Sequence, residues 1–316
     1  MILLIELYSA MKILHDVPVG QFCWLNARIY HNGGGKINNL YVPETVEELK
    51  ECVSNIQQSG KPLFIFGHTS NCYFLPSFCA DSVISTKNLT QYQVFDDKIV
   101  CQPGAHIKKI AKELTYNGIK GYSGLVDLPG TVAAAVVGNA GCFGCETKDI
   151  VESVELLLSD GTIKTLSNAN LGFRRRSSIL KRKEIEGVIL SVTLKKEKGN
   201  KDELISHAEQ CHTERKKNQP SPANNLGSNF MSGAKTLKLR VVERLVRDFG
   251  RLFKLDNNQQ FRLLLRVFGK KNLIPYLFNL NRFMWIDEKS HKAFEEYTSF
   301  YRKIYRNANL EILLFK

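Results

Sequence analysis

The sequence lacks both a long hydrophobic run and an excess of acidic residues. None of its apolar stretches reaches the roughly 20 residues that a membrane-spanning helix needs. The first residues, MILLIELYSAM, resemble a secretion signal only in part, because they lack a basic start and Glu6 interrupts the apolar run. Met11 offers an alternative start. We therefore expect a cytoplasmic protein without a membrane partner.

A paired cysteine spacing is also missing. The cysteines are scattered between Cys23 and Cys211, and a chain of this length does not need disulfides to hold a core. Cys142 and Cys145 form a CxxC, but neither a second such pair nor paired histidines follow at zinc-like spacing. We expect no metal site, and we interpret the cysteines as thiols in a reducing compartment.

Positive charge, in contrast, is abundant. The chain carries 44 Lys and Arg against 31 Asp and Glu, a formal net charge of +13 over 316 residues. Such an excess favours an anionic partner, which can be nucleic acid, an anionic membrane, or a small molecule with phosphate and carboxylate groups. Composition alone does not choose among the three.

Hydrophobic periodicity in the first half predicts alternating strands and helices. Thr45 caps a predicted helix that Gly60 ends, and the apolar PLFIF that follows is typical of a buried strand. A second helix is predicted from about His106 to Asn117. Turns at Asp96–Asp97 and Asp160–Gly161 predict two hairpins.

The second half changes in character. A charged stretch follows the apolar strand EGVILSVTLKK and predicts a domain boundary near residue 199. From about Leu237 the pattern is mostly helical, and it ends in an amphipathic helix and a last apolar strand. The sequence therefore predicts an α+β fold in two parts.

Two glycine-bearing loops call for a functional interpretation. FGHTSN follows a buried strand, and its backbone N–H groups and small hydroxyls suit a pyrophosphate, although this loop taken alone favours an ordinary turn. The second stretch, DLPGTVAAAVVGNAGCFG at 127–144, is unlike an ordinary helix or strand and lets backbone approach a flat ligand closely. A flavin ring system is such a ligand.

Together these loops resemble a known family. Gly67, Ser70 and Asn71 match a GxGSN motif, and residues of the second loop match a GIPGTVGGA…NAGxxG motif. Phe173, Arg176 and Ser178 then match FxYRxS, and a QP…GSxF motif matches Gln219, Pro220, Gly227, Ser228 and Phe230. Four motifs in this order resemble the UDP-N-acetylenolpyruvoylglucosamine reductase family, which has a PCMH-type flavin fold.

The resemblance implies a domain plan and a cofactor. A two-lobed FAD-binding domain would span residues 1–198, with its lobes divided near residue 88, and a smaller α+β substrate-binding domain would span 199–316. FAD would be bound non-covalently, NADPH would be the co-substrate, and the protein would be a monomer without a nucleic-acid partner. The implied cofactor-binding residues are Gly67, His68, Thr69, Ser70, Asn71, Pro129, Gly130, Thr131, Asn139, Ala140, Gly141 and Gly144.

The resemblance also implies a reaction. In this family NADPH reduces the flavin, and flavin N5 delivers hydride to the enolpyruvyl group of UDP-N-acetylglucosamine enolpyruvate, a step in peptidoglycan synthesis. Arg176 matches the arginine that stabilises negative charge on the substrate, and Ser228 matches the proton donor. The family's late glutamate falls on Leu313 in simple register, so Glu311 is a displaced candidate.

Several positions depart from the family pattern, more of them in the substrate half. Thr69 replaces a glycine, Ala133–Ala134 replace Gly-Gly, and Asp127 puts a charge where a glycine is usual. Past Ser228, the usual FKNP reads FMSG. A flavin-binding protein with a different acceptor or no reductase activity is therefore the alternative. A third hypothesis makes the basic carboxy-terminal part a nucleic-acid or membrane-surface binder.

Overall fold

Two compact units make up the chain. The computed structural model describes residues 12–18, 35–219, 225–231, 233–286 and 289–315. Residues 12–18, 36–69 and 79–217 belong to the first unit, whereas 70–78 and the residues from 218 onward belong to the second. The possible start at Met11, the leader-like run before it and Pro220 lie outside the described residues.

The first sheet of the first unit has the strand order β1-β2-β5-β3. Its strands are β1 (Lys12–Pro18), β2 (Lys36–Val42), β3 (Leu63–Phe66) and β5 (Cys79–Ser85). β1 is antiparallel to β2, whereas β5 is parallel to both β2 and β3. The predicted helix is α2 (Val46–Gln58), and the Thr45 hydroxyl accepts the Glu48 N–H at 3.1 Å, as an N-cap should.

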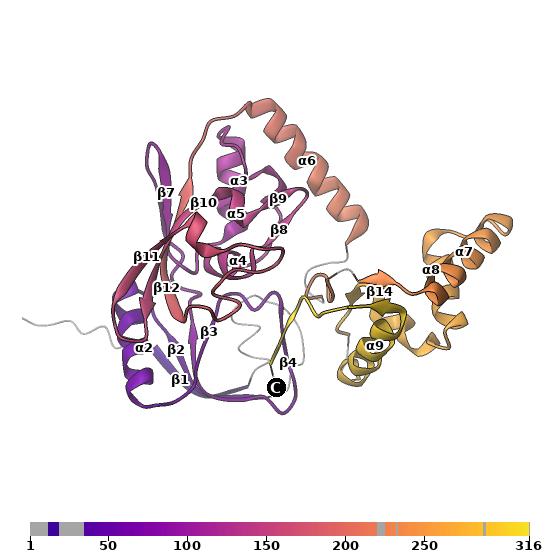
Figure 1. Ribbon diagram of the computed structural model, residues 1–316, viewed down its shortest axis with the longest axis horizontal. Coiled ribbons are helices and arrows are strands. Elements are labelled where there is room, and N and C mark those ends of the chain that lie inside the picture. The colour runs from indigo at the N-terminus through magenta and orange to yellow at the C-terminus, as the bar shows by residue number, and fades with distance from the viewer. Residues whose placement is uncertain (1–11, 19–34, 220–224, 232, 287–288, 316) are drawn as a thin grey trace, which may run out of the picture. The chain divides into compact units, whose positions relative to one another are not determined.

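The second sheet of this unit is antiparallel throughout, in the order β11-β10-β12-β7-β6. Its strands are β6 (Tyr92–Val94), β7 (Lys98–Cys101), β10 (Val151–Leu158), β11 (Ile163–Ser167) and β12 (Gly187–Lys195). Both predicted hairpins are confirmed, since Asp96–Asp97 joins β6 to β7 and Asp160–Gly161 joins β10 to β11. Figure 1 shows these strands on one side of the helices α3, α4 and α5.

Helices of the first unit pack on the second sheet. They are α3 (Ile107–Tyr116), α4 (Val132–Gly138) and α5 (Thr147–Ile150), with 3-10 turns at Ser123–Leu125 and Asn168–Leu171. α6 (Lys201–Asn218) follows the last strand of the sheet, and its His207 Nδ1 lies 2.8 Å from the Ser123 hydroxyl. α3 buries Ile107, Ile110 and Leu114 in the main core of this unit. Between α4 and α5 lies a small hairpin of β8 (Gly141–Cys142) and β9 (Cys145–Glu146).

The second unit is mostly helical around an aromatic core. Its helices are α7 (Leu237–Leu252), α8 (Asn257–Val267), α9 (Ser290–Ile304) and a 3-10 helix at Lys271–Tyr276. Its strand pairs are β4 (Cys72–Phe74) with β17 (Leu313–Phe315), β13 (Ala234–Lys235) with β16 (Tyr305–Arg306), and β14 (Leu277–Asn279) with β15 (Arg282–Phe283). The predicted amphipathic helix is α9, and its aromatic side chains are buried with Phe283 and Tyr73.

The architecture is α+β, as the sequence predicts. The compact units divide after Lys217, and the segment 70–78 is grouped with the second unit. The functional division into a flavin-binding and a substrate-binding domain at residue 199 stays a prediction. Within the described ranges, no helix is both long and apolar enough to cross a membrane.

Candidate active site

The two glycine-bearing loops lie against each other in the first unit. A Cβ added to Gly67 would lie 2.5 Å from Thr131 Oγ1 and 2.8 Å from its Cγ2. A glycine is therefore required at position 67 for the loops to approach this closely. The Gly130 carbonyl accepts the Ile107 N–H at 3.3 Å, which ties the second loop to the start of α3.

His68 and Thr69 continue the first loop into the interior. The His68 side chain is buried against His106, with the two ring centroids 4.2 Å apart. Burial, and to a smaller extent His106, lowers the pKa of His68 to about 4, so the ring is neutral at pH 7. Thr69 is 4% exposed in a left-handed conformation, and its Oγ1 lacks a hydrogen-bond partner among the described residues.

The Gly/Ala-rich stretch is not all irregular backbone, and that expectation was wrong. Residues Val132–Gly138 form helix α4, capped by the Thr131 hydroxyl, which accepts the Ala134 N–H at 3.3 Å. Alanine is the best helix former, and the low content of large side chains hid this signal. Pro129 and Gly130 precede the helix, and Gly130 has a φ of 113°.

Asn139 ends α4 at a buried corner. It is fully buried in a left-handed conformation, and its Nδ2 donates to the Arg174 carbonyl at 3.0 Å while its Oδ1 accepts the Lys148 N–H at 3.0 Å. Ala140 follows, and its carbonyl accepts both the N–H and the hydroxyl of Thr147. The sequence predicts Asn139 and Ala140 as neighbours of a cofactor, and the contacts show that they also fix the turn after α4.

Arg176 lies at the same corner. Its guanidinium donates to the Gly141 carbonyl at 2.7 Å and to the Asn139 carbonyl at 3.5 Å. A tight turn presents it, because Arg174 and Ser177 exchange backbone hydrogen bonds around it. Arg174 is exposed, whereas Arg176 is half-buried. The predicted arginine therefore contacts the backbone of the Asn139–Gly141 segment, which belongs to the second loop.

The second unit brings three other candidates together. Asn71 Nδ2 donates to the Glu311 carbonyl at 3.2 Å, and the Glu311 N–H donates to the Asn229 carbonyl at 2.8 Å. Ser228 immediately precedes Asn229 and is half-buried, as is Glu311. These two hydrogen bonds connect the segments that contain Asn71, Ser228 and Glu311. Ser70, in the same unit, is half-buried in a turn with Asn71.

Leu313, where the family register puts a glutamate, lies on β17 opposite Cys72. It is 38% exposed. Glu311 lies two residues before this strand, and the backbone bends at Ile312 between the two positions. The role of the Glu311 carboxylate stays a prediction.

Asp127, the unusual charge, is compensated within the first unit. Its Oδ2 lies 2.6 Å from His212 Nδ1, its Oδ1 lies 3.0 Å from Lys108 Nζ, and its side chain is only 12% exposed. Burial alone would raise the pKa of Asp127, but the hydrogen bonds from His212 and Lys108 outweigh it and leave this pKa below the ordinary value.

Sequence reasoning missed these partners, and it missed His106. His212 lies in α6 and His106 directly precedes α3, far from the motifs that pointed to the loops. One signal was available: a buried carboxylate requires a basic partner. The sequence alone does not say which of its many basic residues supplies it.

Cys142 and Cys145, the CxxC of the β8–β9 hairpin, are thiols and do not form a disulfide. The same holds for the other cysteines within the described ranges. Cys142 Sγ donates to the Gly124 carbonyl at 3.0 Å, and burial raises the pKa of this thiol to about 11. A group of three or more side chains suited to a metal ion does not occur among the residues described. Gly144 faces open space in the hairpin turn with a φ of 79°.

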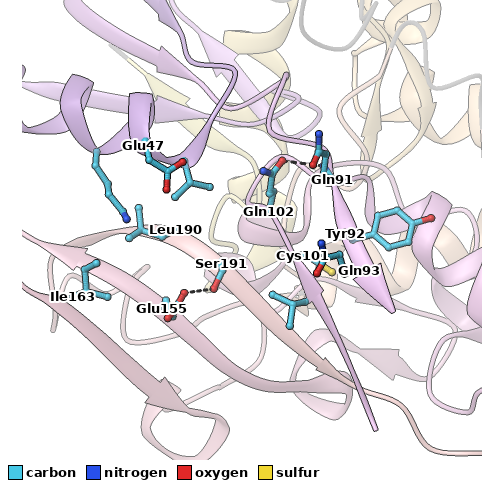
Figure 2. Close-up of a pocket in the computed structure, with 13 residues that line it drawn as sticks. Glu47, Gln91, Tyr92, Gln93, Cys101, Gln102, Glu155, Ile163, Leu190 and Ser191 are labelled. Atoms are coloured by element: carbon cyan, nitrogen blue, oxygen red, sulfur yellow. Dashed lines mark hydrogen bonds between the residues drawn. The ribbon is translucent and has the colours of Figure 1, made fainter. Parts of the chain in front are cut away.

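A separate cavity of about 380 Å³ lies in the first unit, beside α2 and the second sheet (Figure 2). Glu155 accepts the Ser191 hydroxyl at 2.6 Å, and Gln102 accepts the Gln91 N–H at 3.0 Å. None of the residues predicted for cofactor binding or catalysis lines this cavity. It is therefore distinct from the loops described above.

The loops of the first unit fit the flavin cofactor that the resemblance implies. Thr69 Oγ1 is a buried hydroxyl whose hydrogen-bonding capacity is unused by the described residues. Gly138 and Gly144 face space in which an added methyl group would meet nothing within 4 Å.

The comparisons with known proteins agree with this geometry. A family profile described as an FAD binding domain matches residues 38–167. UDP-N-acetylenolpyruvoylglucosamine reductases of Limosilactobacillus reuteri and Clostridioides difficile are 30% and 33% identical over 222 and 228 residues. These alignments cover 70% and 72% of this chain, and 74% and 72% of the two relatives.

Coverage is lower for one relative. The reductase of Caldanaerobacter subterraneus is 32% identical over 197 residues, so this chain spans just under two thirds, 65%, of its length. The crystal structure of UDP-N-acetylenolpyruvylglucosamine reductase from Thermus caldophilus shares the fold. Its TM-score is 0.69 at 22% identity, over 97% of this chain and 100% of that one.

The reductases of Limosilactobacillus reuteri and Clostridioides difficile are at least 30% identical to this chain, and the alignments cover more than two thirds of this chain and of each relative. The chain therefore belongs to the UDP-N-acetylenolpyruvoylglucosamine reductase family and contains an FAD-binding domain.

Proposed function

We propose that the chain is an FAD-dependent oxidoreductase that uses NADPH to reduce the enolpyruvyl group of UDP-N-acetylglucosamine enolpyruvate or of a related nucleotide-sugar. Family membership at 30–33% identity is the observation that carries this proposal. The net charge of +13 supports it, because the substrate class carries a diphosphate and a carboxylate.

In the first unit, the residues proposed to hold FAD are those of the two loops. The Thr69 hydroxyl supplies a buried hydrogen-bonding group that the described residues leave unused, and Gly67 lets the two loops pack closely, because a side chain there would meet Thr131. When bound, FAD supplies hydride chemistry, accepting hydride from NADPH and passing it on. The neutral ring of His68 adds no positive charge to the loop at pH 7.

Arg176 is proposed as the cationic anchor for negative charge on the substrate. A guanidinium offers five N–H donors, and two of its nitrogens already donate to the Gly141 and Asn139 carbonyls. These contacts fix its orientation before a substrate arrives, and a preorganised cation stabilises developing charge best. Arg176 thus acts both on the loop and on the substrate.

Ser228 is proposed as the proton donor, with Glu311 as the carboxylate that assists it. A serine hydroxyl is a weak acid, so a neighbouring polar group has to stabilise its conjugate base. The Asn229 carbonyl accepts the Glu311 N–H, which supports the two residues working close together in the second unit.

An anaerobic stopped-flow titration of the FAD-loaded protein tests the proposal. NADPH is added first and UDP-N-acetylglucosamine enolpyruvate second, while flavin absorbance is followed. We expect bleaching by NADPH and recovery on adding the enol ether. Bleaching without recovery would favour the alternative, a flavoprotein with a different electron acceptor. That alternative is suggested by Leu313, which stands on β17 where the family register has a glutamate.

Two variants sharpen the assignment of Arg176. Arg176→Lys keeps the charge but loses the forked geometry, so we expect FAD to be retained and recovery by the enol ether to slow by about 100-fold, a loss typical of one oxyanion-stabilising donor. Arg174→Lys is the matched control, since Arg174 lies in the same turn but is exposed. Equal slowing in both variants would remove Arg176 from the proposed chemistry.

A further inference from the structure

Helix α7 carries an apolar stripe on its outer side. Five large side chains of this helix are between 47% and 76% exposed, namely Leu237, Val241, Leu245, Phe249 and Leu252. Their spacing of four, four, four and three residues places them along one side of a helix. Phe253 extends the stripe, with its ring centroid 4.3 Å from that of Phe249.

This stripe is not the face that holds α7 in its unit. Leu239, Val246 and Gly250 form the buried face, and Leu239 and Val246 join the core that contains Leu264 and Leu265 of α8. Figure 1 shows α7 and α8 side by side. The helix is therefore anchored on one side, and no described residue buries the stripe on the other.

A row of arginines runs beside the stripe. Arg240, Arg244, Arg247 and Arg251 recur at spacings of four, three and four residues, and all four are exposed. Asp248 is the carboxylate nearest to them, 3.9–4.0 Å from three of the guanidinium groups. The other carboxylate of α7, Glu243, pairs with Lys235 at 2.6 Å. The row therefore keeps a net positive charge.

We propose that α7 docks this chain onto an anionic lipid surface. A helix with large apolar side chains on one side and basic residues beside them lies in the plane of the membrane interface. The leucine and phenylalanine side chains would enter the region below the headgroups, and the arginines would contact lipid phosphates. At 16 residues, α7 offers about 24 Å of such contact.

Two other occupants fit less well. A second copy of the chain docking through the same stripe would bring its arginine row close to this one, and like charges would oppose the contact. A nucleic acid would use the arginines but would leave the exposed leucines in water. An acidic protein partner would need a groove for a convex helix, whereas a fluid lipid surface adapts to it.

Flotation of the full chain with lipid vesicles tests this proposal. Vesicles of phosphatidylcholine alone are compared with vesicles that contain phosphatidylglycerol in addition, at low and at high salt. We expect binding to the anionic vesicles and at least tenfold weaker binding to the neutral ones, with a loss at high salt. A Phe249→Trp variant should show a blue-shifted emission when anionic vesicles are added.

Matched variants assign the contact to α7. We expect Leu245→Asn with Leu252→Asn to weaken anionic binding about tenfold, and Arg244→Gln with Arg251→Gln to weaken it similarly. The control is Ile163→Asn with Lys112→Gln, an exposed apolar and an exposed basic position of the first unit. It should bind like the unchanged chain. Circular dichroism and thermal unfolding check that each variant is folded.

Three results would overturn the proposal. They are absence of flotation with anionic vesicles at low salt, equal flotation of the Leu245→Asn, Leu252→Asn variant, and a dimer in sedimentation equilibrium that this variant dissociates. The last result would identify a second copy as the occupant. Flavin absorbance, recorded on the same samples, shows separately whether FAD is bound, so a failure here is distinguishable from a failure of the proposed reductase.

Discussion

At the scale of single residues, Gly67 sets how closely two loops of the first unit approach. The Thr131 side chain occupies the space that a methyl group on residue 67 would need. Thr131 cannot rotate away freely, because its hydroxyl caps α4 by accepting the Ala134 N–H. Crowding at this point therefore disturbs both the loop and the helix.

We predict that Gly67→Ala lowers the free energy of unfolding by about 1–3 kcal/mol, the usual cost of overpacking. It should also lower FAD retention, if the loops hold the cofactor as proposed. Urea unfolding and flavin absorbance after gel filtration measure the two effects.

Gly138→Ala provides the control for this change. Gly138 is the last residue of α4, and an added Cβ would meet nothing within 4 Å. We expect it to leave the unfolding free energy unchanged or to raise it by up to about 1 kcal/mol, as alanine is the better helix former. Equal destabilisation by both changes would contradict the role given to the Gly67–Thr131 contact.

His68 makes stability depend on pH. Its pKa is about 4 in the folded chain, and an unfolded histidine titrates near pH 6.5. Between these values the unfolded state binds more protons than the folded state. The contribution of His68 to the free energy of unfolding is therefore complete above pH 6.5 and is lost as the pH falls toward 4. The difference corresponds to roughly 3 kcal/mol in total.

The test compares the unchanged chain with His68→Gln at pH 7 and pH 5. On lowering the pH, we expect the unchanged chain to lose roughly 2 kcal/mol more unfolding free energy than the variant. Comparing the two cancels the titration of carboxylates that both share. Parallel losses in the two proteins would show that His68 is not buried as the structure has it.

At the scale of secondary structure, α4 connects the two groups of candidate residues in the first unit. Thr131 caps its start and Asn139 ends it, so its seven residues hold these groups about 10 Å apart. Asn139 combines a left-handed backbone, with a φ of 41°, and three side-chain hydrogen bonds, to Glu146, Arg174 and Lys148. The helix end is therefore fixed by conformation and by bonding.

Two substitutions separate these contributions. Asn139→Gly keeps the left-handed conformation accessible but loses the side-chain bonds, and we expect it to cost about 2–3 kcal/mol. Asn139→Ala loses the same bonds and also strains the backbone, so it should be less stable again by about 1 kcal/mol. Chemical denaturation gives both values, and an alanine variant as stable as the glycine variant would contradict the backbone argument.

Elements with strong local signals were predictable from sequence. The apolar positions of α2 recur at helical spacing after the capping Thr45, and the Asp160–Gly161 turn marks its hairpin directly. α4 was missed because its alanines bury little surface and give almost no periodicity. The contact of Arg176 with Gly141 could not be predicted, since it joins residues that only the packed fold brings together.

At the scale of the whole molecule, the segment 70–78 is the feature that local patterns could not reveal. β4 pairs in parallel with β17, and the hydroxyl of the fully buried Tyr73 lies 2.7 Å from His291 Nδ1. A parallel pair between distant strands carries no turn signal. The sequence therefore showed the motif containing Ser70 and Asn71, but not the unit to which it belongs.

This arrangement predicts how a chain truncated after Lys217 behaves. Tyr73, Phe74 and Phe78, at most 2% exposed in the intact protein, would lose their partners in the second unit. We expect the truncated chain to aggregate and to bind an apolar dye. Replacing residues 70–78 by a Gly/Ser segment of equal length should restore a soluble first unit, as size-exclusion chromatography would show. Aggregation of both truncated chains would contradict this explanation.

The same strand pair has a consequence during synthesis. Asn71 and the residue whose carbonyl it contacts, Glu311, are 240 positions apart. At 5–20 residues per second, a ribosome takes roughly 10–50 s to add them. During that time the aromatic segment at 72–78 has no strand partner and can be bound by a chaperone. Pairing with β17, once β17 has been synthesised, removes this binding site.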